Sequence, residues 1–124
     1  MVLPFEEEYR KKYYKLLDEV FDSNFWSDGK MTRMFEEKFE EYIGLPSCAV
    51  TSGGAGLLSI FEYIGVRGYD VIVPANTFWA TTQAAKMAGA NIIYTDCNKE
   101  DLCLSYEDLI RKVTPNTIIF FSLK

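Results

Sequence analysis

The chain has 124 residues, a formal net charge of −5 and a hydrophobic content of 48%, which is typical of one globular domain and excludes a disordered chain. The negative charge disfavours a nucleic-acid surface, so we expect no nucleic-acid partner. No stretch has the sustained apolar character of a membrane span and no secretory signal is visible, so we expect no membrane partner either. The absence of histidine excludes hydrolysis by a serine–histidine or cysteine–histidine pair, and three cysteines without metal-type spacing predict no metal site and a reducing, cytoplasmic location.

Apolar residues recur at helical spacing in the first third of the sequence. The pattern predicts an amphipathic helix over about 5–21 and a second helix over about 33–43, with Thr32 as the N-cap of the second. Gly44 fits the position just after that helix, and Pro46 prevents the helix from continuing.

Beyond this point, short apolar runs alternate with helical patterns. Buried strands joined by helices predict a mainly parallel α/β sheet, so we divide the chain into a helical segment, 1–45, and an α/β portion, 46–124. Cys48 lies in the first apolar run and is expected to be a small core residue. The predicted strands cover about 48–51, 70–73, 91–96 and 117–122, and the predicted helices cover about 53–65, 78–88 and the segment from the Ser105 N-cap to Lys112.

The glycine-rich turn at 51–56 lies between a predicted strand and a predicted helix. Its glycines allow backbone N–H groups to approach an anion, and the unpaired N–H groups of the helix start add positive field. A tight turn without a ligand is the alternative. The glycine spacing differs from that of a dinucleotide site, and no Lys-Ser/Thr follows as in a P-loop, which disfavours an independent nucleotide-binding domain.

A set of short motifs follows a fixed order along the chain. They are Gly29-Lys-Met-Thr-Arg-Met-Phe-Glu36, Phe39-Glu-Glu-Tyr-Ile-Gly44, Ser52-Gly53, Tyr69-Asp-Val-Ile-Val-Pro74, Asn76-Thr77-Phe78, Gly89-Ala90 and Tyr94-Thr95-Asp96. Together they resemble the N-terminal part of the nucleotide-sugar aminotransferases of the DegT/DnrJ/StrS type, over about residues 20–121. These are pyridoxal 5′-phosphate (PLP) enzymes of aspartate-aminotransferase fold, usually homodimers. The resemblance implies that this chain is the N-terminal part of the large domain of a fold type I enzyme.

The resemblance also implies a cofactor site with two parts. Phe78 matches the aromatic residue that stacks on the pyridine ring, with Trp79 as a less favoured candidate and ordinary core packing as the alternative for both. Family members often carry a hydroxyl residue at the Gly54 position, so glycine there is expected to weaken the grip on the cofactor phosphate. The residues implied to receive that phosphate are Ser52, Gly53, Gly54 and Ala55.

The resemblance places the Schiff-base lysine and the pyridinium aspartate later than any residue of this sequence. Asp96 fits an earlier strand end and is expected to be a turn or cap residue. Lys86 lies in a predicted helix and Lys124 is on the wrong strand, so neither matches the lysine. We therefore expect no catalytic residue here and no transamination by this chain alone.

Two functions stay open. The chain is either an N-terminal fragment of a PLP-dependent sugar aminotransferase or a non-catalytic binding and assembly module. In the first case the complete enzyme would transfer an amino group from glutamate to a keto sugar linked to a nucleotide, and an apolar strand at 117–122 without a covering helix favours truncation or splitting. In the second case the chain would form a homodimer or associate with a separately encoded C-terminal portion.

Overall fold

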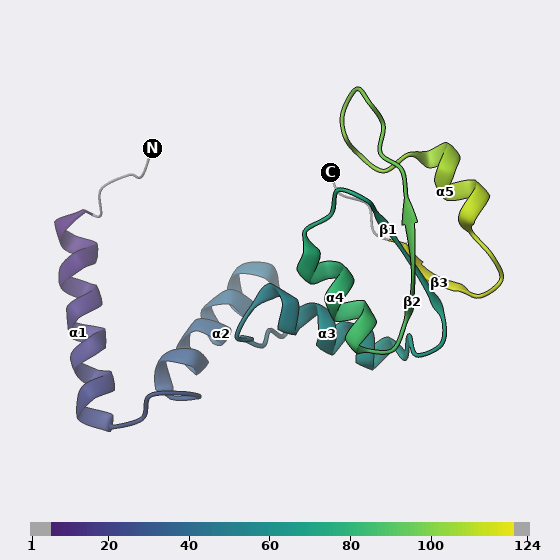
Figure 1. Cartoon of the computed structure of the whole chain (residues 1–124). Coiled ribbons are helices and arrows are strands. Elements are labelled where there is room, and N and C mark those ends of the chain that lie inside the picture. The colour runs from purple at the N-terminus through teal and green to yellow at the C-terminus, as the bar shows by residue number, and fades with distance from the viewer. Residues whose placement is uncertain (1–5, 121–124) are drawn as a thin grey trace. The chain divides into compact units, whose positions relative to one another are not determined.

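By its internal contacts the chain divides into two units, residues 1–49 and residues 50–124. The computed structural model in Figure 1 describes residues 6–120. In that part of the chain, no helix is long and apolar enough to cross a membrane. The elements are α1 (Glu7–Ser23), α2 (Lys30–Ile43), α3 (Gly53–Ile64), β1 (Asp70–Pro74), α4 (Trp79–Met87), β2 (Asn91–Thr95), α5 (Tyr106–Lys112) and β3 (Thr117–Phe120).

The first unit consists of α1 and α2 joined by a turn, so the two predicted helices are confirmed. Asn24 and Asp28 adopt left-handed backbone conformations in the turn, with φ angles of 53° and 50°. Asn and Asp tolerate this conformation because their short polar side chains form local hydrogen bonds. An ion pair of 2.8 Å between Lys30 Nζ and Glu19 Oε2 connects the two helices.

The start of α2 differs from the prediction, because Gly29 and not Thr32 is the N-cap. Gly29 is extended, with φ −95° and ψ −170°, and its carbonyl accepts a hydrogen bond from the Arg33 N–H at 3.3 Å. Thr32 therefore lies within the first helical turn. Apolar periodicity missed this boundary because Gly29 acts through its backbone conformation and not through a side chain.

The strand predicted at 48–51 is wrong, since these residues form no strand in the structure. The Ala49 N–H donates to Glu36 Oε1 at 2.7 Å, and the Ser47 hydroxyl donates to the Glu36 carbonyl at 2.8 Å. An apolar run forms a strand only when a neighbouring strand pairs with its backbone groups, and here α2 supplies the partners. Cys48 is exposed, so the expectation of a core cysteine is also wrong.

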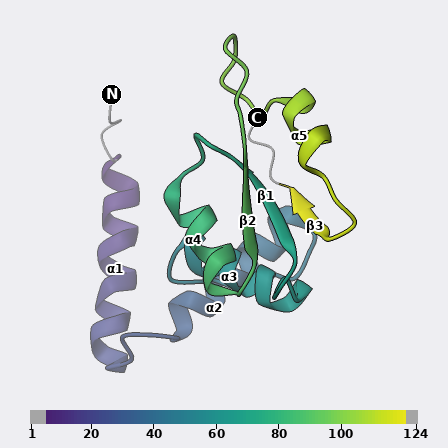
Figure 2. The same cartoon turned by 45° about the vertical axis from the view of Figure 1, so that its right-hand side comes forward.

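The second unit is built on a parallel sheet with the strand order β2-β1-β3. The chain passes from β1 to β2 in one direction and from β2 to β3 in the other. Because crossovers between parallel strands are right-handed, this order puts α4 and α5 on opposite faces of the sheet. Figure 2 shows the two helices on either side of the strands. The predicted α/β class and parallel sheet are confirmed.

The core of this unit lies between the sheet and the pair α3 and α4. Successive strand residues face opposite sides, so Val71 and Val73 of β1 pack on this core while Ile72 is buried on the other face. Phe61 of α3 is fully buried among alanines of α4. This packing fixes α3 beside α4, and it sets the relative positions of their N-terminal ends.

Candidate functional site

Ser52 caps the N-terminus of α3. Its backbone is extended, its Oγ accepts a hydrogen bond from the Ala55 N–H at 3.1 Å, and its carbonyl accepts from the Gly56 N–H at 3.0 Å. The N–H groups of Gly53 and Gly54 have no acceptor among the described residues. A serine hydroxyl that accepts one hydrogen bond keeps its proton to donate. The turn therefore offers three donors to an anion: two backbone N–H groups and one hydroxyl.

The two glycines at the start of α3 leave these donors uncovered. A Cβ atom built on Gly53 would meet nothing within 4 Å. A Cβ atom on Gly54 would lie 3.6 Å from the Ala80 Cβ and 3.8 Å from the Ser52 Oγ, which are ordinary van der Waals contacts. Small side chains therefore fit at both positions. At Gly54 there is room for a side chain with a hydroxyl group, although this sequence has none there.

Two aromatic side chains stand at the N-terminus of α4. Phe78 is the N-cap and Trp79 is the first helical residue. Their side chains are 68% and 69% exposed, which disfavours core packing as the role of either ring. The ring centroids lie 5.7 Å apart at an interplanar angle of 51°.

The glycine-rich turn and the two aromatic rings line one cavity. It has a volume of about 720 Å³ and lies between α3 and α4, a size that suits a small organic ligand. The structure thus brings together all of the cofactor-binding residues predicted from the sequence, Ser52, Gly53, Gly54, Ala55 and Phe78. The remaining wall is largely apolar and is formed by Leu57, Leu58, Ala80, Thr81, Gln83, Ala84 and Met87 together with Trp79.

The cavity combines a cluster of N–H and O–H donors with aromatic and apolar walls. Among the described residues that line it, none carries a charge, so any attraction for an anion comes from the donors and from the positive end of α3. This combination suits a ligand with a phosphate at one end and a planar ring at the other. The residues present therefore fit PLP.

The ionisable residues considered from the sequence lie outside this cavity. Asp96 follows β2, where its N–H donates to Asp108 Oδ2 at 2.8 Å and its carbonyl accepts from the Ser105 N–H at 2.9 Å. It lies just after the end of β2, in neither a turn nor a helix cap, so the expectation of a turn or cap residue is wrong. Lys86 is an exposed residue of α4, and Lys124 lies outside the described residues. In the described ranges, no cluster of potential ligands could hold a metal ion.

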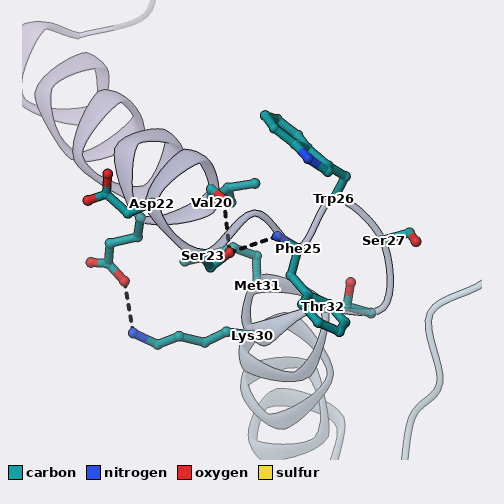
Figure 3. Close-up of a pocket in the computed structure, with 11 residues that line it drawn as sticks. Val20, Asp22, Ser23, Phe25, Trp26, Ser27, Lys30, Met31 and Thr32 are labelled. Atoms are coloured by element: carbon teal, nitrogen blue, oxygen red, sulfur yellow. Dashed lines mark hydrogen bonds and ion pairs between the residues drawn. The ribbon is translucent and has the colours of Figure 1, made fainter.

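A second cavity lies at the corner between α1 and α2 and was not foreseen from the sequence. It has a volume of about 460 Å³, and Figure 3 shows Trp26 and Lys30 among its lining residues. Two polar pairs lie at this corner: Lys30 pairs with Glu19, and the Trp26 indole N–H donates to Asn24 Oδ1 at 3.2 Å. Trp26 also packs edge-on against Phe21. We interpret this corner as a structural joint between the helices.

The fold and the cavity together define an α/β protein of the fold type I class of PLP enzymes. The DegT/DnrJ/EryC1/StrS aminotransferase family matches residues 7–122, and the chain belongs to this family. Membership implies pyridoxal phosphate as the cofactor.

The proteins that are similar to this chain match it over a small part of their own length. A dTDP-4-dehydro-2,3,6-trideoxy-D-glucose 4-aminotransferase from Saccharopolyspora spinosa is 31% identical over 103 residues, 80% of this chain and 27% of the relative. A 3-oxo-glucose-6-phosphate:glutamate aminotransferase from Bacillus subtilis is 30% identical over 82% of this chain and 23% of its own length. The PLP form of a sugar aminotransferase from Streptococcus pneumoniae superposes with a TM-score of 0.72 at 26% identity, covering 84% of this chain and 28% of that one. The chain therefore spans less than a third of these proteins.

Proposed function

We propose that the cavity between α3 and α4 binds PLP, with the phosphate at Ser52–Ala55 and the pyridine ring on Phe78. The proposal rests on one observation: three hydrogen-bond donors that have no acceptor among the described residues, and an exposed aromatic ring, line the same cavity. Either feature alone is common, whereas both together match a phosphorylated aromatic ligand.

Each of these residues has a distinct part in binding. The N–H groups of Gly53 and Gly54 and the Ser52 hydroxyl donate to phosphate oxygens, while Ala55 holds the Ser52 oxygen in place through its own N–H. Phe78 offers a ring face for stacking. When bound, PLP supplies the electron sink that amino-group transfer requires. The binding residues orient that group and do not themselves transfer protons.

For the complete protein we propose amino transfer from glutamate to a nucleotide-linked keto sugar. The support comes from the family and from the named relatives, one of which acts on a dTDP-linked sugar and another of which uses glutamate. The lysine and aspartate that would complete catalysis are proposed to come from polypeptide beyond this sequence. Reading the coding sequence past Lys124 tests this, because unrelated sequence in every frame contradicts it.

The alternative of a non-catalytic assembly module has its own support in the first unit. Within the described chain neither α1 nor α2 has a buried residue, and their apolar faces carry exposed aromatic side chains such as Phe35 and Tyr42. Such faces favour a protein partner. We propose a homodimer or association with the C-terminal portion, in the cytoplasm. A monomer at high concentration in sedimentation experiments contradicts the homodimer.

Binding of pyridoxamine 5′-phosphate tests the proposed site. This ligand has the ring and phosphate of PLP but an amine in place of the aldehyde, so it cannot bond covalently to lysines. Equilibrium dialysis is expected to show saturable binding that Phe78→Ala weakens. Tyr63→Ala is the control, because Tyr63 lies on α3, is 93% exposed and does not line the cavity. Binding that is equal in both variants contradicts the proposal.

A further inference from the structure

Trp79 places a large aromatic side chain at the N-terminus of α4. It is the first residue of α4, and more than two thirds of its surface is exposed. It lines the proposed cofactor cavity next to Phe78 without belonging to the core.

The contact that Trp79 makes is with Phe78. Phe78 projects from an extended N-cap, and its side chain is itself mostly exposed. Within the described residues, Trp79 provides the one aromatic ring that packs against Phe78. A tilted ring pair of this separation is favourable and restricts the rotation of both rings. The angle of the Phe78 ring therefore depends on Trp79.

Trp79 also lines two cavities. One is the cavity with the glycine-rich turn, and the other is a smaller cavity of about 320 Å³ that Thr77, Thr82 and Tyr94 also line. Gln83, one turn further along α4, lines both as well. Loss of the indole would leave the Phe78 ring without its aromatic neighbour.

We propose that Trp79 is a positioning residue for the cofactor ring: it holds the Phe78 ring at the angle that receives the pyridine ring. This inference rests on the proposed function of the cavity. Trp79 acts through Phe78 and not on the phosphate, whose donors lie at the start of α3. A ring held in place before binding loses less conformational entropy when the ligand arrives, which raises affinity.

Two ligands separate the effect on the ring from the effect on the phosphate. Trp79→Ala is expected to weaken pyridoxamine 5′-phosphate binding about fivefold, the factor that corresponds to one aromatic pair. Binding of inorganic phosphate, followed by phosphorus NMR, is expected to stay unchanged. Trp79→Phe keeps a ring and is expected to restore most of the affinity. Tyr63→Ala removes an exposed aromatic side chain outside this cavity and is the matched control, which is expected to leave both affinities unchanged.

A spectroscopic measurement distinguishes positioning from general stability. Pyridoxamine 5′-phosphate is achiral, so its absorption band shows circular dichroism only when the protein holds the ring at a fixed angle. At saturating ligand, Trp79→Ala is expected to reduce this band and Trp79→Phe to restore it. An unchanged band and unchanged affinity in Trp79→Ala overturn the inference, as does a failure of Trp79→Phe to restore either. Absence of any ring binding by the unaltered chain overturns instead the proposed function.

Discussion

The hydroxyl oxygen of Ser52 accepts a hydrogen bond from the backbone N–H of Ala55 at 3.1 Å. This bond begins α3 and at the same time directs the remaining hydroxyl proton away from the Ala55 N–H. One side chain therefore serves both the fold and the proposed phosphate site. The two roles can be separated by experiment, because a second serine in the chain forms a similar cap without lining the cavity.

Ser52→Ala is expected to lower the free energy of unfolding by about 1 kcal/mol and also to weaken phosphate binding. The control is Ser105→Ala at the start of α5, where Ser105 Oγ accepts from the Asp108 N–H at 3.4 Å. That change is expected to lower stability and leave phosphate binding intact. Urea unfolding and phosphate titration of both variants provide the comparison. Equal loss of phosphate binding in the two variants contradicts a direct role for the Ser52 hydroxyl.

Gly54 is the position at which added side chains should change anion binding in opposite directions. Gly54→Asp is expected to abolish phosphate binding, since the carboxylate would face the anion, whereas the uncharged Gly54→Asn should retain part of it. Gly54→Ser adds a hydroxyl where the structure has room and is expected to tighten binding about threefold, as one further hydrogen bond would. If the Asp and Asn variants bind phosphate with the same affinity, this turn is not part of the phosphate site.

Asp108 is expected to contribute to stability in a pH-dependent way. The hydrogen bond from the Lys112 ammonium and then that from the Asp96 N–H hold the pKa of Asp108 below its ordinary value of 3.8. A carboxyl group with a lowered pKa in the folded state stabilises the fold above its unfolded pKa, and this contribution is lost as the pH falls through the folded pKa. Asp108→Asn should therefore be less stable than the unaltered chain at pH 7 and should differ less from it at strongly acidic pH. Urea unfolding at the two pH values measures this, and a difference that grows on acidification contradicts the assignment.

Phe61 tests how far the site depends on the core beneath it. Phe61→Ala is expected to cost about 3–5 kcal/mol, because it opens a cavity between α3 and α4 in a fully buried position. Ile60→Ala, at a neighbouring exposed position of α3, should cost much less. Thermal unfolding of the two variants gives the comparison. Similar losses in both would show that α3 is not anchored through Phe61.

The sequence predicted the second unit better than the first. Strands β1 and β2 alternate with helices, and each is short, apolar and followed by a turn, so periodicity alone located them. The Ser105 cap was also predicted, since a serine that precedes a helical pattern commonly accepts a hydrogen bond from a backbone N–H of the first turn. The cavity residues were found through the family resemblance, because a glycine-rich turn by itself does not specify a ligand.

The failures have a common physical cause in contacts that local pattern does not encode. The Ala49 N–H donates to the side chain of Glu36, thirteen positions earlier, and not to a neighbouring strand. Gly29 is the N-cap of α2 through its backbone conformation, which has no side-chain signature. The sequence prediction therefore chose Thr32, the next residue with a capping side chain. The contact between Phe78 and Trp79 likewise depends on the geometry at the start of α4, so sequence reasoning treated the two rings as competitors.

The most direct test of the cofactor cavity is a nitrogen–proton NMR titration of the 124-residue chain with pyridoxamine 5′-phosphate. If the cavity is the site, the largest shifts will fall on the backbone N–H groups of Gly53 and Gly54 and on the indole N–H of Trp79. The indole N–H of Trp26, at the corner between α1 and α2, will not move. Shifts centred on Trp26, or none at Gly53 and Gly54 at saturating ligand, would contradict the assignment.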